Sequence, residues 1–102
     1  MAIDAQEVTK KNLNAFKTRM RIFESDEEED KNVSSMISAS IKAVANLTGA
    51  TEASEELLEL AFERARYVYY DALDEFQKNY ADEIETLYLT NKYKDIEEPS
   101  HD

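Results

Sequence analysis

The chain of 102 residues contains no cysteine, no tryptophan, one glycine, one proline and one histidine. Without cysteine it can form neither disulfides nor thiolate metal sites. Because the only glycine is Gly49, no glycine-rich phosphate loop can be built. So few helix breakers argue against an all-β or loop-rich fold and predict long helices.

Catalytic groups are equally scarce. Cysteine is absent and the single histidine, His101, is near the C-terminal end, so no nucleophile can be matched with a base. His101 could serve as a ligand or base, but a solvated position is the favoured interpretation. No carboxylate is distinguished by a buried sequence context. We therefore predict that the protein is not an enzyme and uses no cofactor.

The acidic run at residues 26–30, Asp-Glu-Glu-Glu-Asp, could in principle chelate a metal ion. Calcium loops, however, require a turn-forming glycine and alternating ligands. Consecutive acids on a helix point in different directions, whereas acids in a first helical turn are favoured by the helix dipole. The run is therefore interpreted as a solvated helix start, and no metal site is predicted.

The formal charge of −11 is unevenly distributed. Residues 1–23 carry five basic and two acidic groups, whereas residues 24–30 carry six acidic groups and no basic one. Affinity for nucleic acid comes mainly from Lys and Arg that neutralise phosphates, so the overall balance opposes DNA binding. The acidic charge balance is compatible with binding to basic partners, or with a surface that repels DNA.

The first residues show no signal-peptide pattern, and no apolar run approaches the ~20 residues of a membrane span. We therefore expect a soluble, intracellularly made protein without membrane contact.

Capping patterns predict the first helices. Asp4 and Glu7 form a capping box that starts a helix running to about Arg21, with Thr9 as a competing start. Ile22 and Phe23 are expected to bury their side chains in the core and so anchor the end of this helix. A second box, Ser25 to Glu28, starts a helix at about residue 26 that ends near residue 48.

Residues 33–80 are predicted to form an antiparallel helical hairpin that turns at Gly49 in a left-handed conformation. Ser54 or Thr51 caps its second helix, which is expected to span residues 55–79. The first arm has one apolar stripe at helical spacing, formed by Val33, Met36, Ile37, Ile41, Val44 and Leu47. The second arm has two adjacent apolar stripes, Leu57, Ala61, Ala65, Val68, Ala72 and Phe76, and Leu58, Phe62, Tyr69, Leu73 and Tyr80. This apolar surface exceeds what one helix pair needs.

Two segments leave alternatives open. The patch Tyr67-Val-Tyr69-Tyr70 is either mostly core or partly an interface to another subunit. Residues 82–90 favour a short helix, begun by Asp82 and Glu85, over a strand at residues 86–90. Residues 91–102 are too polar to pack alone and are expected to form a flexible acidic tail. The fold class is thus all-α: a bundle of three to four helices around a long antiparallel hairpin, with domain 1–90 and tail 91–102.

The layout resembles the head–tail connector proteins, also called adaptor or head-completion proteins, of long-tailed bacteriophages. Four segments over residues 12–75 carry the resemblance: Thr18-Arg-Met-Arg-Ile22, the acidic Ser25–Asp30, the helix ending in Asn46-Leu-Thr-Gly49, and the Leu-, Ala- and Tyr-rich Leu57–Tyr70. Where many relatives carry a His-Trp-Tyr-like cluster, this chain has Tyr67-Val-Tyr69-Tyr70.

The resemblance implies a structural virion protein without enzymatic activity. Its subunits would form a ring, commonly of twelve copies, beneath the portal protein. The ring would extend the DNA channel, through which genome DNA passes without specific binding. It would also provide a platform for the next head-completion (stopper) or tail protein. The implied location is the virion, and the host cytoplasm during assembly.

The resemblance also implies portal contacts from the C-terminal segment, with candidates Leu87, Tyr88, Leu89, Tyr93 and Ile96. A ring needs two unlike patches on each subunit. We assign these to the basic first helix and the acidic segment after it, with Tyr67 and Tyr70 as further interface candidates. The charged candidates are Lys10, Lys11, Lys17 and Arg21, and Asp26, Glu27, Glu28, Glu29 and Asp30.

Two alternatives remain. The first is a small acidic inhibitor that imitates DNA, although the acids outside residues 24–30 are scattered among basic residues. The second is a helical interaction module such as an antitoxin or regulatory subunit, which would form a small defined oligomer in isolation.

Overall fold

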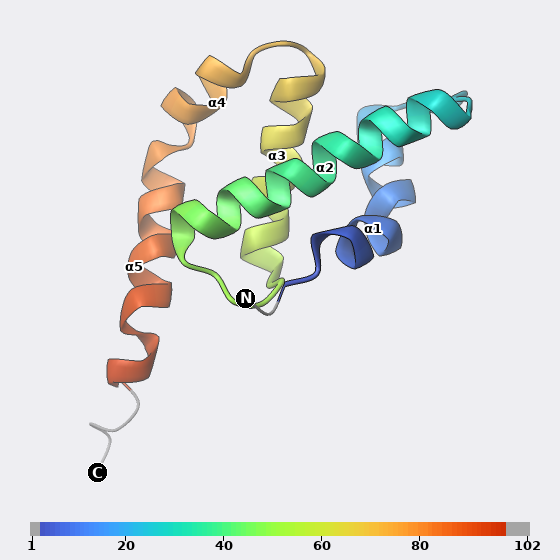
Figure 1. Cartoon of the computed structure of the whole chain (residues 1–102). Helices are drawn as coiled ribbons and strands as arrows, with labels where there is room; N and C mark the ends of the chain where they lie inside the picture. The colour runs from blue at the N-terminus through green and yellow to red at the C-terminus, as the bar shows by residue number, and fades with distance from the viewer. Residues whose placement is uncertain (1–2, 98–102) are drawn as a thin grey trace.

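The computed structural model describes residues 3–97 and consists of five helices, with no strand in that range. The helices are α1 (Ala5–Met20), α2 (Glu27–Thr48), α3 (Glu55–Tyr69), α4 (Leu73–Asn79) and α5 (Ala81–Glu97). The all-α class predicted from sequence is confirmed. Helix α2 crosses the molecule and contacts α1, α3 and α5 (Figure 1).

Helix α1 begins where the capping box predicts. The Asp4 carboxylate accepts a hydrogen bond from the Glu7 backbone N–H at 3.2 Å, which satisfies one of the free donors of the first turn. The helix ends at Arg21, which adopts a left-handed φ of 61°. The Ile22 N–H then donates to the Lys17 carbonyl at 2.8 Å, so the end is closed without glycine.

The hairpin predicted around Gly49 is present. Asp26, one residue beyond the predicted Ser25, caps α2 by accepting from the Glu29 N–H at 2.8 Å. Gly49 ends the helix at φ 69°, where glycine has no Cβ penalty. Ser54 caps α3 by accepting from the Leu57 N–H at 3.1 Å, which selects Ser54 over Thr51.

The prediction of one continuous helix over residues 55–79 is wrong. Helix α3 ends at Tyr69, and α4 starts at Leu73 after a sharp corner (Figure 1). Asp71 takes a left-handed φ of 58°, and the Ala72 N–H donates to the Tyr67 carbonyl at 2.7 Å. Asp is one of the few residues other than Gly that visit this conformation, so the corner leaves no glycine signal in the sequence.

The C-terminal region is helical, and the strand alternative for residues 86–90 is wrong. Helix α5 begins at Ala81, so Asp82 lies inside its first turn instead of capping it. The helix continues to Glu97, so there is no break in secondary structure at the predicted boundary of residue 91. Residues 98–102, including His101, lie outside the described residues. Flexibility of segment 91–102 stays a prediction.

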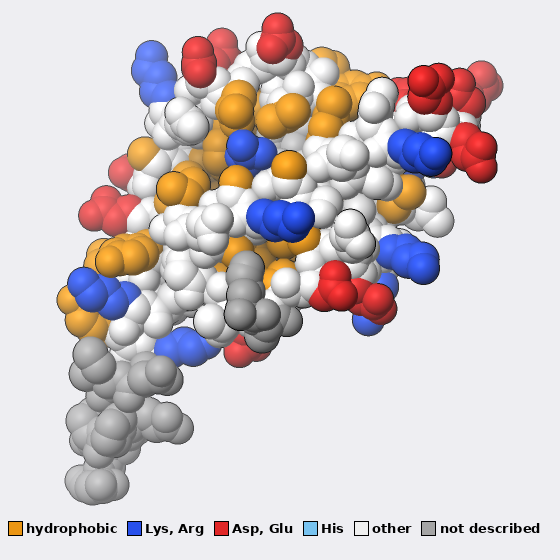
Figure 2. Space-filling model, viewed as in Figure 1, with side chains coloured by type: hydrophobic (Ala, Val, Ile, Leu, Met, Phe, Trp, Pro, Cys, Tyr) orange, Lys and Arg blue, Asp and Glu red, His pale blue; other side chains and the backbone are white. Residues whose placement is uncertain are grey.

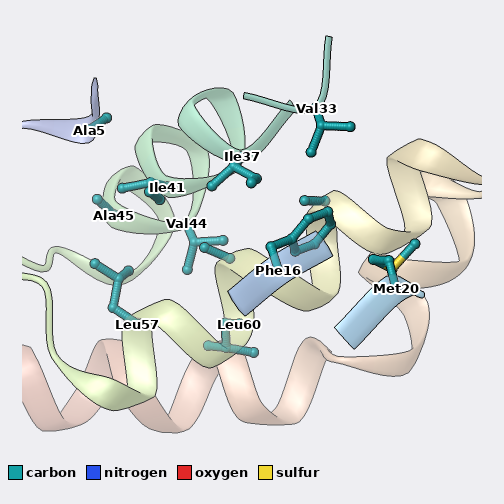
Figure 3. Close-up of a cluster of buried hydrophobic side chains, with 12 residues drawn as sticks. Ala5, Phe16, Met20, Val33, Ile37, Ile41, Val44, Ala45, Leu57 and Leu60 are labelled. Carbon is teal, nitrogen blue, oxygen red and sulfur yellow. The ribbon is translucent and has the colours of Figure 1, made fainter. Parts of the chain in front are cut away.

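The core lies where α1 and α3 meet α2 (Figure 3). Its side chains come from the predicted stripes of α2 and α3 and from the inner side of α1. Fully buried large members are Phe16, Val33, Ile37, Ile41, Val44 and Leu57. Phe76 of α4 is also buried, against Tyr67 and Tyr80. Burial of such side chains stabilises the fold by about 1.5–3 kcal/mol each.

Two apolar predictions fail at the ends of helices. Ile22 packs partly against the core, but the Phe23 side chain is 74% exposed and does not anchor the helix end there. Leu47, assigned to the apolar stripe of α2, is 51% exposed. Phe23 follows the end of α1 and Leu47 precedes the end of α2, where helical periodicity no longer indicates the buried side.

Among residues 3–97, no helix combines the length and apolar content that a bilayer crossing requires.

Candidate functional site

Acidic and basic side chains at the N-terminal end of the molecule are paired with each other inside one chain. Lys17 Nζ lies 2.8 Å from Asp30 Oδ1, and Ser25 Oγ donates to the same oxygen at 2.7 Å. The hydrogen bond from Lys17, and then that from Ser25, lowers the pKa of Asp30 below its usual value. The basic helix and acidic segment predicted to meet between subunits therefore touch within the subunit at this pair.

The remaining charged candidates differ in how far they are engaged. Lys11 lies 3.8 Å from Glu7, with both side chains largely exposed. Lys10 and Arg21 are exposed and form no ion pair with the side chains described for residues 3–94. Glu27 and Glu28 are exposed, whereas the Asp26 and Glu29 side chains make contacts within the chain. Only part of the predicted charged set is thus free for another molecule.

The tyrosines after Arg66 are divided between inside and outside. Tyr67 is half-buried against Phe76 and Tyr80, with ring centroids 5.8 and 5.9 Å away. Tyr69 is half-buried, and its hydroxyl donates to Glu29 Oε2 at 3.0 Å, which raises the pKa of Tyr69. Tyr70 is 61% exposed. Of these three tyrosines, Tyr70 is the one that leaves most of its side chain in solvent.

Glu63 connects three parts of the molecule. It accepts hydrogen bonds from Arg66 Nη2 at 2.7 Å and from the Tyr80 hydroxyl at 2.9 Å, and Arg19 of α1 lies 4.0 Å away. Burial raises the pKa of Glu63, but the hydrogen bonds from Arg66 and Tyr80 and the nearby arginine charges lower it overall. The carboxylate stays ionised and holds α3 to Tyr80, next to the start of α5.

A groove of about 790 Å³ runs between α1 and α2. We call it the lysine–serine groove because three lysines and three serines line it: Lys10, Lys31, Lys42, Ser34, Ser35 and Ser38. None of these lysines forms an ion pair within the described part of the chain. Thr9, which also lines the groove, is 4% exposed, and its hydroxyl has no hydrogen-bond partner in the part of the chain whose side chains are described, residues 3–94.

A second groove, of about 950 Å³, lies between α3 and α5 and shares no lining residue with the first. We call it the acidic groove, since its lining includes Glu56, Glu59, Glu63, Asp82 and Glu83. Its apolar lining is Leu60, Tyr80 and Leu87, and Leu60 points from α3 toward α5 (Figure 3). Arg19 engages one wall, with Nη2 at 2.6 Å from Glu59.

Helix α5 presents the candidate portal contacts on two sides. Leu87 is half-buried and packs against the core. Tyr88, Leu89 and Tyr93 are between 41% and 48% exposed, and we call these three residues the outer face of α5. Lys92 Nζ lies 5.7 and 5.4 Å from the two tyrosine rings of this face. The side chain of Ile96 lies outside the described set.

Sequence reasoning missed both grooves. Ser34 and Ser38 border the buried stripe of Val33, Ile37 and Ile41, and Ser35 lies on the exposed side of α2, so this polar strip was a visible signal. The acidic groove could not be found in this way, because it depends on how α5 returns against α3.

No cluster of three or more acidic, histidine or cysteine side chains suited to one metal ion occurs among the described side chains of residues 3–94. In residues 26–30, the Asp26 carboxylate caps the helix and the Asp30 carboxylate is paired with Lys17. Their geometry is that of a helix start and not of a ligand set.

Comparison of the chain with family models, with curated proteins and with solved structures found no match.

Proposed function

We propose that the protein is a ring-forming head–tail connector of a long-tailed bacteriophage. In this role it binds the portal protein, extends the DNA channel and offers a platform to the next head-completion or tail protein. The observation that carries the proposal is the outer face of α5. Three large side chains, Tyr88, Leu89 and Tyr93, share an exposed face of a helix whose inner residues Ile84 and Leu87 hold it to the bundle. Clustered exposed apolar groups mark interaction sites.

The character of α5 suits a partner of this kind. Tyrosine supplies large contact area with little conformational entropy to lose, and its hydroxyl remains able to hydrogen-bond at a wet interface. The face carries Lys92 between the two rings, so it is amphipathic and tolerates solvent before assembly. The net charge of −11 also suits a channel that must not hold DNA.

Electron microscopy of the protein mixed with purified portal protein of the same phage tests the proposal. We expect an added ring of density at one end of the portal. The triple variant Tyr88→Ser, Leu89→Ser, Tyr93→Ser should abolish this ring while keeping the helical circular dichroism of the wild type. Phe23→Ser, at a 74% exposed position away from α5, is the matched control and should leave the ring intact. Absence of any wild-type ring would contradict the function.

The acidic groove favours a second candidate, a small helical interaction module such as a DNA-mimic inhibitor or an antitoxin-like regulator. Five carboxylates and Lys94 line this groove with apolar side chains between them. Glu59 and Glu63 are paired with arginines, and the other three carboxylates suit a basic amphipathic segment of a partner protein. Binding to a nuclease or toxin without binding to portal would support this candidate. In that case the protein should form a small defined oligomer alone, whereas a connector should assemble on the portal.

A further inference from the structure

The structure assigns an occupant to the lysine–serine groove: the corner between α3 and α4 of a second copy of this chain. We call this corner the acidic corner and define it by Tyr70, Asp71, Asp74 and Glu75. All four residues are exposed, and Tyr70 is exposed over 61% of its surface. The inference rests on the proposed function, because it names the contact between neighbouring copies in the ring.

Charge complementarity favours this occupant. The corner carries three carboxylates, and no basic residue occurs between positions 70 and 77. The groove offers Lys10, Lys31 and Lys42 without ion-pair partners in the described range. Its own acids are Glu27 and Asp30, and Asp30 is already neutralised by Lys17 at 2.8 Å. Three free positive charges therefore face one free negative charge.

Figure 2 shows the two surfaces on separate parts of the molecule. Blue side chains are spaced along the front of α2 with white ones between them, and red side chains gather at the top over α4 and the connection before it. A patch that meets a different patch on the next copy makes a heterologous contact. Such contacts generate rings when the rotation closes, which is the assembly that the proposed function needs.

The groove also carries an unmet hydrogen-bonding group. The Thr9 hydroxyl is buried without a partner in the part of the chain whose side chains are described, residues 3–94. Small serine side chains at positions 34, 35 and 38 leave room for a bulky group to approach the backbone of α2. A tyrosine such as Tyr70 supplies both an apolar ring and a hydroxyl that can donate or accept. The serine-lined part of the groove thus has room and polar groups for the Tyr70 side chain, whereas the Thr9 hydroxyl lies beneath its surface.

The geometry of the acidic corner suits insertion into the groove of another copy, because its turn is already formed in the single chain. Asp71 holds a left-handed φ of 58° at a position where glycine would adopt this conformation at lower cost. The Asp71 N–H donates to Val68 and the Ala72 N–H to Tyr67, at 3.0 and 2.7 Å, which fixes the turn without an interface. A preformed turn loses little conformational freedom on binding.

Cross-linking tests the contact with little background, because the chain has no cysteine. Two single variants, Ser35→Cys and Asp74→Cys, are mixed with a short bismaleimide linker, in concentrated solution and on purified portal. We expect a cross-linked dimer only in the mixture. Neither variant alone should cross-link, because a head-to-tail contact does not bring two identical positions together. Asn14→Cys, at an exposed α1 position outside the groove, is the matched control for Ser35→Cys and should give no product with Asp74→Cys.

Charge reversal supplies the second measurement. Lys42→Glu in the chain that carries Ser35→Cys, or Glu75→Lys in the chain that carries Asp74→Cys, should each lower the cross-linked fraction by more than about tenfold. Mixing the two reversed chains should restore it, because the pair of unlike charges is re-formed with opposite sign. Failure of this rescue would overturn the assigned pairing of corner and groove.

The outcomes separate this inference from the proposed function. Wild-type rings on the portal without a Ser35–Asp74 cross-link overturn the assigned contact and leave the function standing. A cross-link in concentrated solution without portal rings supports the contact and overturns the function. If wild-type rings and the mixed cross-link are both absent, both proposals fail.

Discussion

The α2–α3 hairpin and helix α5 are the same kind of element, yet they are held in the molecule very differently. In the hairpin, Ile37, Ile41, Val44 and Leu57 have no exposed surface. Across residues 81–94 of α5, no side chain is fully buried, and Ile84, Leu87 and Asn91 are the half-buried contacts. The hairpin therefore defines the fold, whereas α5 is attached with little burial and leaves large side chains exposed. Regions with few buried contacts open at lower free energy.

The largest expected difference comes from truncating one aliphatic side chain in each region. Ile41→Ala removes a fully buried side chain and should lower the free energy of unfolding by about 2–5 kcal/mol. Leu89→Ala, at a 42% exposed position, should change it by less than about 0.5 kcal/mol. Urea denaturation followed by circular dichroism measures both. Losses of similar size would mean that α5 is as integral to the core as α2.

A smaller effect is expected where α5 is attached to α2. Asn91 Nδ2 donates to the Thr48 carbonyl at 2.8 Å, across the end of α2. Asn91→Ala should weaken the attachment by about 1 kcal/mol, which corresponds to about fivefold faster hydrogen exchange of α5 amides. Exchange in α2 should be unchanged. Asn14→Ala, which removes an exposed amide from α1, is the control and should leave α5 exchange as in the wild type.

The smallest expected effect depends on pH and concerns Glu63, between α3 and the start of α5. The pKa of Glu63 in the folded protein is below its ordinary value of 4.5. The ionised Glu63 therefore contributes its full stabilisation of the folded state at pH values above its pKa in the unfolded chain. This stabilisation is lost as the pH falls through the lower pKa of Glu63 in the folded protein. Between about pH 6 and pH 3, the wild type should lose more stability than Glu63→Gln.

Denaturation midpoints at several pH values measure this difference. Glu85→Gln, at an exposed position without an ion pair in the described range, is the matched control and should follow the wild-type curve. Parallel curves for Glu63→Gln and the wild type would show that the contacts of Glu63 with Arg66 and Tyr80 do not stabilise the fold.

Much of the fold was predictable because its signals are local. Asp4 and Ser54 cap helices through bonds to residues three positions onward, so their role is contained in four residues of sequence. Gly49 marks its turn because the left-handed conformation favours glycine. The corner at Asp71 uses the same conformation without glycine, so it was missed and one helix was predicted in place of two.

The candidate interaction surfaces were less predictable because they depend on distant residues. Lys17 and Asp30 were both assigned to an interface, yet they pair with each other once α1 folds against α2. Helix α1 covers part of the second apolar stripe of α3, since Phe62 contacts Phe16 of α1 with ring centroids 5.6 Å apart. The apolar surface of α3 that seemed too large for one helix pair is therefore partly buried by a third helix. Neither partner is visible from the spacing within one helix.

The sequence by itself determined that this protein is helical, where α1 and α2 begin and end, where α3 begins, and which faces of these helices are apolar. Those properties follow from hydrogen bonds and periodicity within a few residues. Only the tertiary structure decided which charges are already paired, which tyrosines are exposed, and that two grooves lie between the helices. Such features arise when helices far apart in the chain meet, and their positions depend on the packing of the whole core.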